Sequence, residues 1–192
     1  MTFNRRVTAS MLLDTGAPGM YISKELAGKL GLLDSSENNL WIMIGGIGGA
    51  TPAIFTIIDS IQVGAAEDTF IPTYISPKIS SQFDGLIGMD FMASYSMKID
   101  SGKGVVIFEE VPENMNMPAG HDETWWRTTF QNFKSIRQSW EGYRDRLAQK
   151  KSFTDREKQI ESFVQRQCSR ADDLYNKLLV HASTHSVPRE WR

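Results

Sequence analysis

Apolar residues in the first 110 positions fall in short runs, and these runs predict β-strands. They are rich in Ile, Val, Phe and Thr, and Gly, Pro, Asp or Ser bounds each of them, as is usual for strands joined by turns. Closely spaced short strands indicate a small antiparallel barrel or sandwich. Two short helices are expected at 23–30 and 88–94. The predicted strands are 6–13, 40–44, 53–58, 61–63, 70–75, 97–99 and 105–108.

The last third of the chain has a different apolar period and predicts two long helices. Its large apolar residues recur at intervals of three, four or seven positions, which places them on one helix face. Thr154 and Glu157 have the spacing of a capping box that begins the second helix. The short link between the helices predicts an antiparallel helical hairpin. The first stripe is Trp126, Phe130, Phe133, Trp140 and Leu147, and the second begins at Ile160 and continues to Leu179.

Charge and glycine content also divide the chain near residue 115. Residues 1–118 have a net charge of −6 and residues 119–192 a net charge of +4, and all but one of the 15 glycines precede residue 121. We therefore predict a β domain at 1–111, a linker at 112–121 and a helical hairpin extension at 122–192. The fold class is mainly β, a small closed barrel followed by an α-helical hairpin.

Composition excludes several classes of protein. No apolar run approaches the roughly 20 residues of a membrane span. A single cysteine, Cys168, excludes an internal disulfide framework, and its place in an amphipathic helix predicts inert packing. The first residues lack the apolar core of a secretory signal, so a cytoplasmic protein is expected, unless the chain is a fragment that lacks an N-terminal anchor.

Neither a metal, a cofactor nor nucleic acid is expected as a partner. His181 and His185 are four residues apart, but no Glu or Cys accompanies them, so we expect these two and His121 to be solvated side chains at helix ends. Lys and Arg in the second half alternate with Glu and Asp, which is typical of a solvated helix face. Trp125 and Trp126 are expected to anchor a core or an interface.

Two segments contain the candidate chemistry. An apolar strand leads directly into Asp14, Thr15, Gly16 and Ala17, where glycine allows a tight turn and close approach of a ligand. Some 70 residues later, Leu86 and Ile87 precede Gly88, and a short helix follows. Asp84 lacks the hydroxyl residue that follows Asp14, so it is not expected to be a second catalytic copy.

Together these segments resemble the retropepsin-like aspartic proteases, over roughly residues 3–110. The resemblance implies a closed retropepsin-like barrel (the acid protease fold), with Asp14 as the catalytic residue and Leu86, Ile87 and Gly88 as the supporting motif. In this family two aspartates share a proton and activate a water. Because the chain has one Asp-Thr-Gly, the resemblance implies a homodimer that cleaves peptide or protein substrates, with the active site on the two-fold axis.

The family also implies a flap, a β-hairpin with a glycine-rich tip that closes over the substrate. The segment 44–51 fits this tip. An ordinary mobile hairpin is one alternative. A phosphate loop is another, but it would require Lys followed by Ser or Thr and then a helix, whereas Pro52 and a strand pattern follow. The candidate flap residues are Gly45, Gly46, Ile47, Gly48 and Gly49.

Two features leave a second function open. Met89 and Asp90 stand where viral members of the family have a charged dimer contact, so that contact is not carried over. The helical hairpin is expected to pack on the barrel, to pair with the hairpin of a second subunit or to bind a partner, and dimer support is preferred. The alternative to a peptidase is therefore a non-catalytic dimeric peptide-binding or adaptor module on the same fold.

Overall fold

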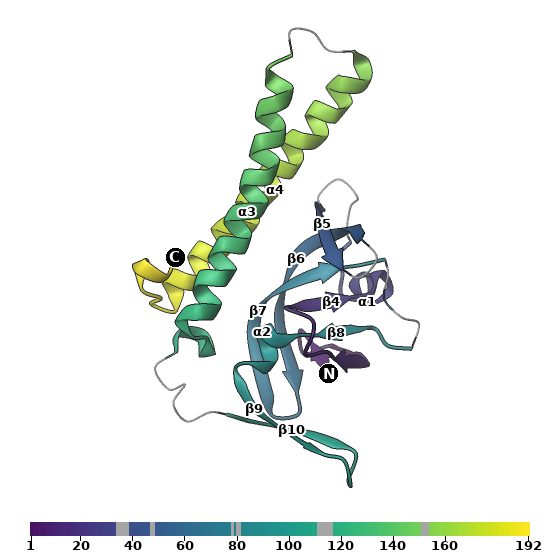
Figure 1. Ribbon diagram of the computed structural model, residues 1–192, viewed down its shortest axis with the longest axis vertical. Coiled ribbons are helices and arrows are strands. Elements are labelled where there is room, and N and C mark those ends of the chain that lie inside the picture. Colours follow the sequence, from purple (N-terminus) through teal and green to yellow (C-terminus); the bar gives the residue numbers. More distant parts are fainter. Residues whose placement is uncertain (34–38, 47–48, 78, 80–81, 111–116, 151–153) are drawn as a thin grey trace.

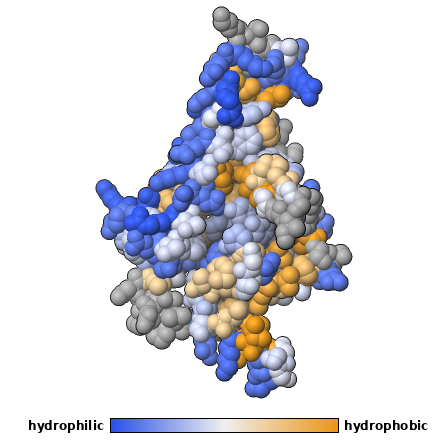
Figure 2. Space-filling view, in the orientation of Figure 1, coloured by the Kyte–Doolittle hydropathy of each residue, from blue (hydrophilic) through white to orange (hydrophobic). Residues whose placement is uncertain are grey.

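The chain folds as a curled β-sheet with a long helical hairpin against it (Figure 1). The computed structural model describes residues 1–33, 39–46, 49–77, 79, 82–110, 117–150 and 154–192. In the space-filling view, hydrophobic atoms gather mainly over the β part, whereas most of the visible hairpin surface is hydrophilic (Figure 2).

The elements follow the order that the apolar pattern predicts, strands first and long helices last. The helices are α1 (Lys24–Lys29), α2 (Met89–Met92), α3 (Glu123–Ala148) and α4 (Asp155–Thr184). The strands are β1 (Thr2–Phe3), β2 (Val7–Thr8), β3 (Met11–Leu13), β4 (Met20–Ile22), β5 (Leu40–Gly46), β6 (Gly49–Val63), β7 (Ala66–Ile75), β8 (Gly85–Ile87), β9 (Tyr95–Asp100) and β10 (Val105–Glu110).

One mixed sheet holds eight of the strands. Its order is β2-β1-β6-β7-β4-β8-β3, with β5 paired to β6, and β9 and β10 form a separate antiparallel ribbon. The mainly β fold followed by helices is thus confirmed. Closure of the barrel is not confirmed, because the path through the described strands ends on β2 at one side and β3 at the other. The domain boundaries at 111 and 122 stay a prediction.

Local differences from the predicted strands have identifiable causes. The predicted strand 6–13 is two strands, because β2 pairs with β1 whereas β3 pairs with β8, and between them Ser10 N donates to Asp84 Oδ2. The predicted strands 53–58 and 61–63 are one strand, β6. Strand β4 was not predicted from its pattern, since three residues are too few to show a period.

A first core lies on one face of the curled sheet. Phe3, Met20, Ile22, Ile58 and Phe91 are all at most 1% exposed there. They come from β1, β4, β6 and α2, so this core joins the N-terminal strand to the elements that surround Asp14.

A second core joins the opposite face of the sheet to the helical hairpin. Phe55 on β6 packs edge-to-face on Phe133 of α3, with ring centroids 5.0 Å apart, and Trp126 and Phe130 are buried in the same cluster. Alternate residues of β6 therefore serve two different cores, as the strand period of two requires. Of the three arrangements expected for the hairpin, the structure shows packing on its own β part.

The helix ends follow the sequence signals. Asp122 caps α3 by accepting from Trp125 N at 2.7 Å. Thr154 caps α4, and Glu157 completes the predicted capping box by accepting from Thr154 N at 2.8 Å. The predicted link 151–153 lies outside the described residues. The second core accounts for Trp126 as the expected anchor, and Cys168 is buried, as inert packing requires.

The expectation of solvated histidines is wrong for His121. Its side chain is 1% exposed, and its Nε2 atom lies 3.2 Å from Asp68 Oδ1 on β7. Its ring stacks on Trp125 with centroids 3.7 Å apart. His181 also stacks, on Phe70, and burial lowers its pKa to about 4. Both histidines are thus part of the contact between helices and sheet, which the local pattern around each residue does not encode.

Candidate active site

Asp14 is positioned by a parallel pairing of two short strands that are distant in sequence. Leu12 lies opposite Leu86 and Leu13 opposite Ile87. Asp14 N donates to Ile87 O at 3.0 Å, which extends the ladder by one residue beyond the end of β3. The two motifs that the sequence singled out, around Asp14 and around Gly88, are therefore brought together.

The loop after Asp14 folds back on the carboxylate. Gly16 N donates to Asp14 Oδ1 at 2.9 Å, and Ala17 N donates to Asp14 O at 3.1 Å. Asp14 is half-buried, Thr15 and Gly16 are exposed, and Ala17 is buried. The side chain thus keeps one fixed orientation at the surface of the sheet, where a ligand can reach it.

The first turn of α2 fixes the same loop from the other side. Met89 N donates to Ala17 O at 2.9 Å, and Asp90 N donates to Pro18 O at 3.2 Å. Gly88 allows this approach, because a Cβ at this position would lie 2.5 Å from both Ala17 O and Gly19 O. The glycine of the supporting motif is therefore needed for close packing of backbone against backbone.

Asp84 has a structural position at the opposite end of β3. Its Oδ2 atom accepts from Ser10 N at 2.8 Å, and its backbone oxygen accepts from Ser23 N at 2.8 Å. These bonds fix the start of β3 and the start of α1. They agree with the expectation that Asp84 is not a second catalytic copy.

The candidate flap is a β-hairpin over its described part. β5 and β6 pair antiparallel from Leu40↔Phe55 to Gly46↔Gly49. Gly49 has φ of +109°, a conformation that favours glycine. Ile47 and Gly48 lie outside the described residues. Because strand β6 and not a helix follows, the phosphate-loop alternative is wrong.

One residue beside the site has a perturbed acidity. Burial raises the pKa of the Asp90 carboxyl to about 6, although Phe91 N donates to its Oδ1 atom at 2.8 Å and lowers the pKa in part. Asp68 lies near enough to raise it further. Asp90 is therefore an acid next to the Asp14 loop that changes charge near pH 6.

Two tyrosines next to the site were not predicted. Tyr21 and Tyr74 stack with ring centroids 5.0 Å apart, and burial raises the pKa of both hydroxyls. Asn132 Nδ2 on α3 donates to Tyr74 Oη at 2.8 Å. No signal in the sequence relates residues from β4, β7 and α3, so only the fold could reveal this group.

The site lies at an open margin of the sheet. β3 is the last strand of the sheet path. Leu12, two residues before Asp14, is 43% exposed, and Met89, whose backbone N donates to Ala17 O in the Asp14 loop, is 42% exposed. Within the described residues no group of three or more metal-ligating side chains occurs. Across the same residues, no helix has the length and apolarity to cross a membrane.

A mixed β-sheet that presents an Asp-Thr-Gly loop beside a hydrophobic-hydrophobic-Gly strand defines an aspartyl protease type of domain. Residues 1–91 match the family model described as aspartyl protease. The prediction of an aspartic protease family is thus confirmed for the N-terminal part of the chain. No curated protein matches the chain.

A solved structure is also similar to this chain. It is a retropepsin-like aspartic protease from Rickettsia conorii, with 23% sequence identity and a TM-score of 0.44. The similarity covers 55% of this chain and 76% of that one.

Proposed function

We propose that the protein is an aspartic endopeptidase that works as a homodimer, with one Asp14 from each subunit. The observation that supports this most directly is the Asp14 loop, which is fixed by β8 on one side and by α2 on the other. Such fixing holds a carboxylate in one orientation before substrate arrives, which is what acid–base catalysis requires.

The proposed mechanism needs two facing carboxylates that hold one proton between them. The ionised carboxylate takes a proton from a water, whose oxygen attacks the carbonyl carbon of the scissile bond. The protonated carboxyl donates a hydrogen bond to the carbonyl oxygen, on which negative charge develops. A proton then passes to the amide nitrogen, the C–N bond breaks, and the pair returns to its singly protonated form.

Two features support dimerisation near Asp14. β3 lies at the end of the sheet path. Leu12 on β3 and Met89, whose backbone contacts the Asp14 loop, have exposed apolar side chains. A second copy placed on this margin would bury both side chains and bring its own Asp14 to the site. The hairpin of β5 and β6 is proposed as the flap that closes over the peptide.

The test is peptide cleavage by the full chain and by Asp14→Asn, which keeps the shape of the side chain and removes its acid–base function. We expect cleavage to fall by about 10²- to 10⁴-fold in the variant. Far-UV circular dichroism of both proteins is the control for folding. Undiminished cleavage by Asp14→Asn would exclude Asp14 from the mechanism.

Sedimentation at high protein concentration tests the dimer. A monomer over the whole concentration range would contradict the shared site. A dimer in which the two Asp14 carboxylates lie far apart would instead favour the non-catalytic peptide-binding module.

A further inference from the structure

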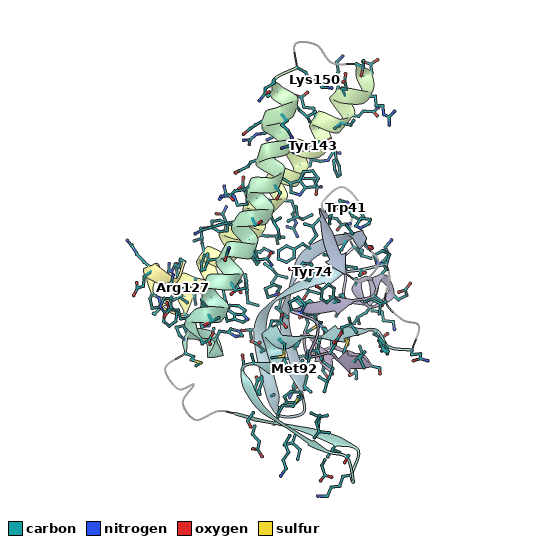
Figure 3. All side chains as sticks on the ribbon, in the orientation of Figure 1. Trp41, Tyr74, Met92, Arg127, Tyr143 and Lys150 are labelled. Atoms are coloured by element: carbon teal, nitrogen blue, oxygen red, sulfur yellow. The ribbon has the colours of Figure 1, made fainter. Side chains whose placement is uncertain are left out.

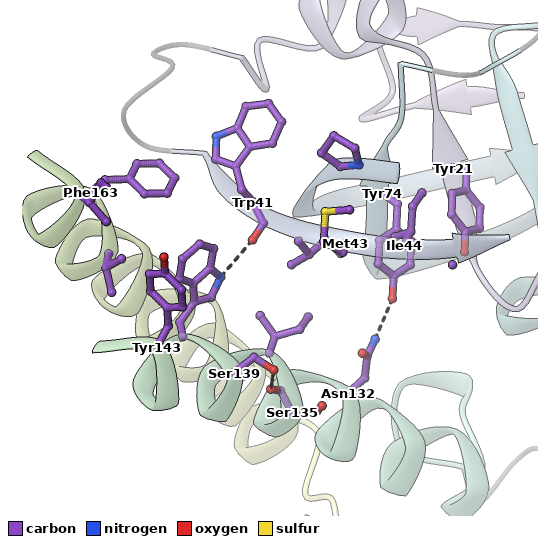
Figure 4. A pocket seen from close by; sticks show the side chains of 17 residues that line it. Tyr21, Trp41, Met43, Ile44, Tyr74, Asn132, Ser135, Ser139, Tyr143 and Phe163 are labelled. Carbon is purple, nitrogen blue, oxygen red and sulfur yellow. Dashed lines mark hydrogen bonds between the residues drawn. The ribbon is translucent and has the colours of Figure 1, made fainter. Parts of the chain in front are cut away.

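A groove of about 860 Å³ lies between the candidate flap hairpin and the helical extension (Figure 4). Met43, Ile44 and Gly45 of β5 line one side, and Ser139 and Trp140 of α3 line the other. Trp41 and Tyr143, labelled in Figure 3, lie on these opposite sides. Both parts of the chain therefore build one concave surface.

Two hydrogen bonds hold the groove open at a fixed width. Asn132 Nδ2 donates to Tyr74 Oη at 2.8 Å, and Trp140 Nε1 donates to Trp41 O at 3.0 Å. Figure 4 shows these bonds at separate places along α3. Between them the helix spans the groove without filling it, so the groove exists before any ligand binds.

The strand register connects this groove to Asp14. Leu12 pairs with Leu86, Leu86 with Tyr21, and Tyr21 with Tyr74. Residues directly opposite on neighbouring strands point to the same face, so these four side chains form one row. Asp14 follows Leu12 by two positions and lies on that face as well. The face that bears Asp14 thus continues into the groove.

The length of this row fixes which part of a substrate would reach the groove. Three steps between strands at about 4.8 Å make roughly 14 Å, which an extended peptide covers in about four residues at about 3.3 Å each. A peptide cleaved at Asp14 would therefore place a side chain about four residues from the scissile bond in the groove.

The lining selects an apolar side chain. None of the groove residues is charged, and its walls include Trp41, Ile136, Phe163 and the 63% exposed Met43. Ser139 Oγ already donates to Ser135 O at 2.8 Å. A charged side chain would lose its hydration in this groove without gaining an ionic partner.

We propose that the helical extension completes a substrate subsite, which binds a large apolar or aromatic side chain about four residues from the scissile bond. The proposal rests on the proposed peptidase function and adds a specificity role for α3. Ser139, at the centre of the α3 wall, is a specificity-determining residue, because a larger side chain there would occupy the groove.

The experiment compares cleavage of a peptide library by the full-length protein, Ser139→Trp and Gln138→Trp. Gln138 is the neighbouring exposed residue on α3 and is not part of the groove, so it is the matched control. We expect wild-type products to show large apolar residues at the stated distance from the cut. For such peptides we expect KM to rise about tenfold or more in Ser139→Trp, with kcat and the cleavage of shorter peptides unchanged.

Met43→Glu, on the opposite wall, is a second and independent variant. The same rise in KM is expected for peptides that carry the apolar residue. If no peptide is cleaved in an Asp14-dependent way, the proposed function fails and the subsite fails with it. If cleavage depends on Asp14 but shows no apolar preference at that distance, the subsite alone is overturned. Equal KM values for Ser139→Trp and Gln138→Trp would overturn it also.

Discussion

Replacing Gly88 with Ala tests the packing on which the Asp14 loop depends. Gly88 has φ of −103° and ψ of −167°, which an alanine adopts without backbone strain. The loss of stability expected from the substitution therefore comes from contacts of the added Cβ and not from backbone strain. An added Cβ would meet three backbone atoms, Ala17 O at 2.5 Å, Gly19 O at 2.5 Å and Gly19 N at 2.8 Å.

The geometry sets the size of the effect. Ordinary contacts of a Cβ atom begin at 3.4 Å, so backbone on two sides must retreat by about 0.9 Å. Overpacking typically costs about 1–3 kcal/mol, and backbone obstacles on both sides place this substitution near or above 3 kcal/mol. Retreat of Ala17 O also lengthens the hydrogen bond that it accepts from Met89 N, which loosens the Asp14 loop.

Urea unfolding measures the loss. With a urea dependence of about 2 kcal/mol per molar, a loss of about 3 kcal/mol lowers the midpoint by about 1.5 M. Gly28→Ala is the matched control, because Gly28 lies in helix α1 with nothing within 4 Å of the added Cβ. The free energy of unfolding of this control is expected to rise by up to about 1 kcal/mol.

Both substitutions remove the same conformational freedom from the unfolded chain, so their difference isolates the contacts of Gly88. Equal midpoints for Gly88→Ala and wild type would show that the turn between β8 and α2 yields without cost. Gly88 would then not be required for the close packing of the Asp14 loop.

Two further substitutions test the contact between sheet and helices and the acidity next to the site. Gln167 is fully buried, accepts from Trp41 N at 2.7 Å and donates to Asn39 O at 2.9 Å. Gln167→Leu should therefore lose roughly 2–5 kcal/mol in urea unfolding, since two partly buried backbone groups lose their partners; an equal loss in the exposed control Gln165→Leu would contradict this. Because its folded pKa is raised to about 6, Asp90 makes the wild type less stable as pH rises from about 4 to about 6. Asp90→Asn should gain stability relative to wild type over this window, by at most roughly 3 kcal/mol and less to the extent that water reaches the carboxylate; a difference that does not change with pH would refute the assignment.

The lowered pKa of His181 changes the stability of the fold in the opposite direction over the same pH range. A histidine whose folded pKa is about 4 adds stability as pH rises from about 4 to about 6.5. This contribution is present in both wild type and Asp90→Asn, so it cancels in their difference. The comparison of the two proteins, and not the profile of either one, is therefore the informative measurement.

The sequence predicted those helices, caps and turns that depend only on residues close together in the chain. The capping box of Thr154 and Glu157 involves residues three apart, and the apolar stripes of α3 and α4 repeat within a few turns. The Asp14 turn needs only an apolar strand and a following glycine. By contrast, β4 and the break between β2 and β3 depend on partners elsewhere in the chain, so the local pattern did not predict them.

The sequence by itself thus determined the candidate carboxylate, the order of strands before helices, and the helix ends. Only the tertiary structure decided that His121 is buried against Asp68, that Asn132 meets Tyr74, and that α3 and β5 form one groove. The physical reason is that periodicity fixes which face of an element is apolar. It does not fix which other apolar face, often 60 or more residues away, covers it.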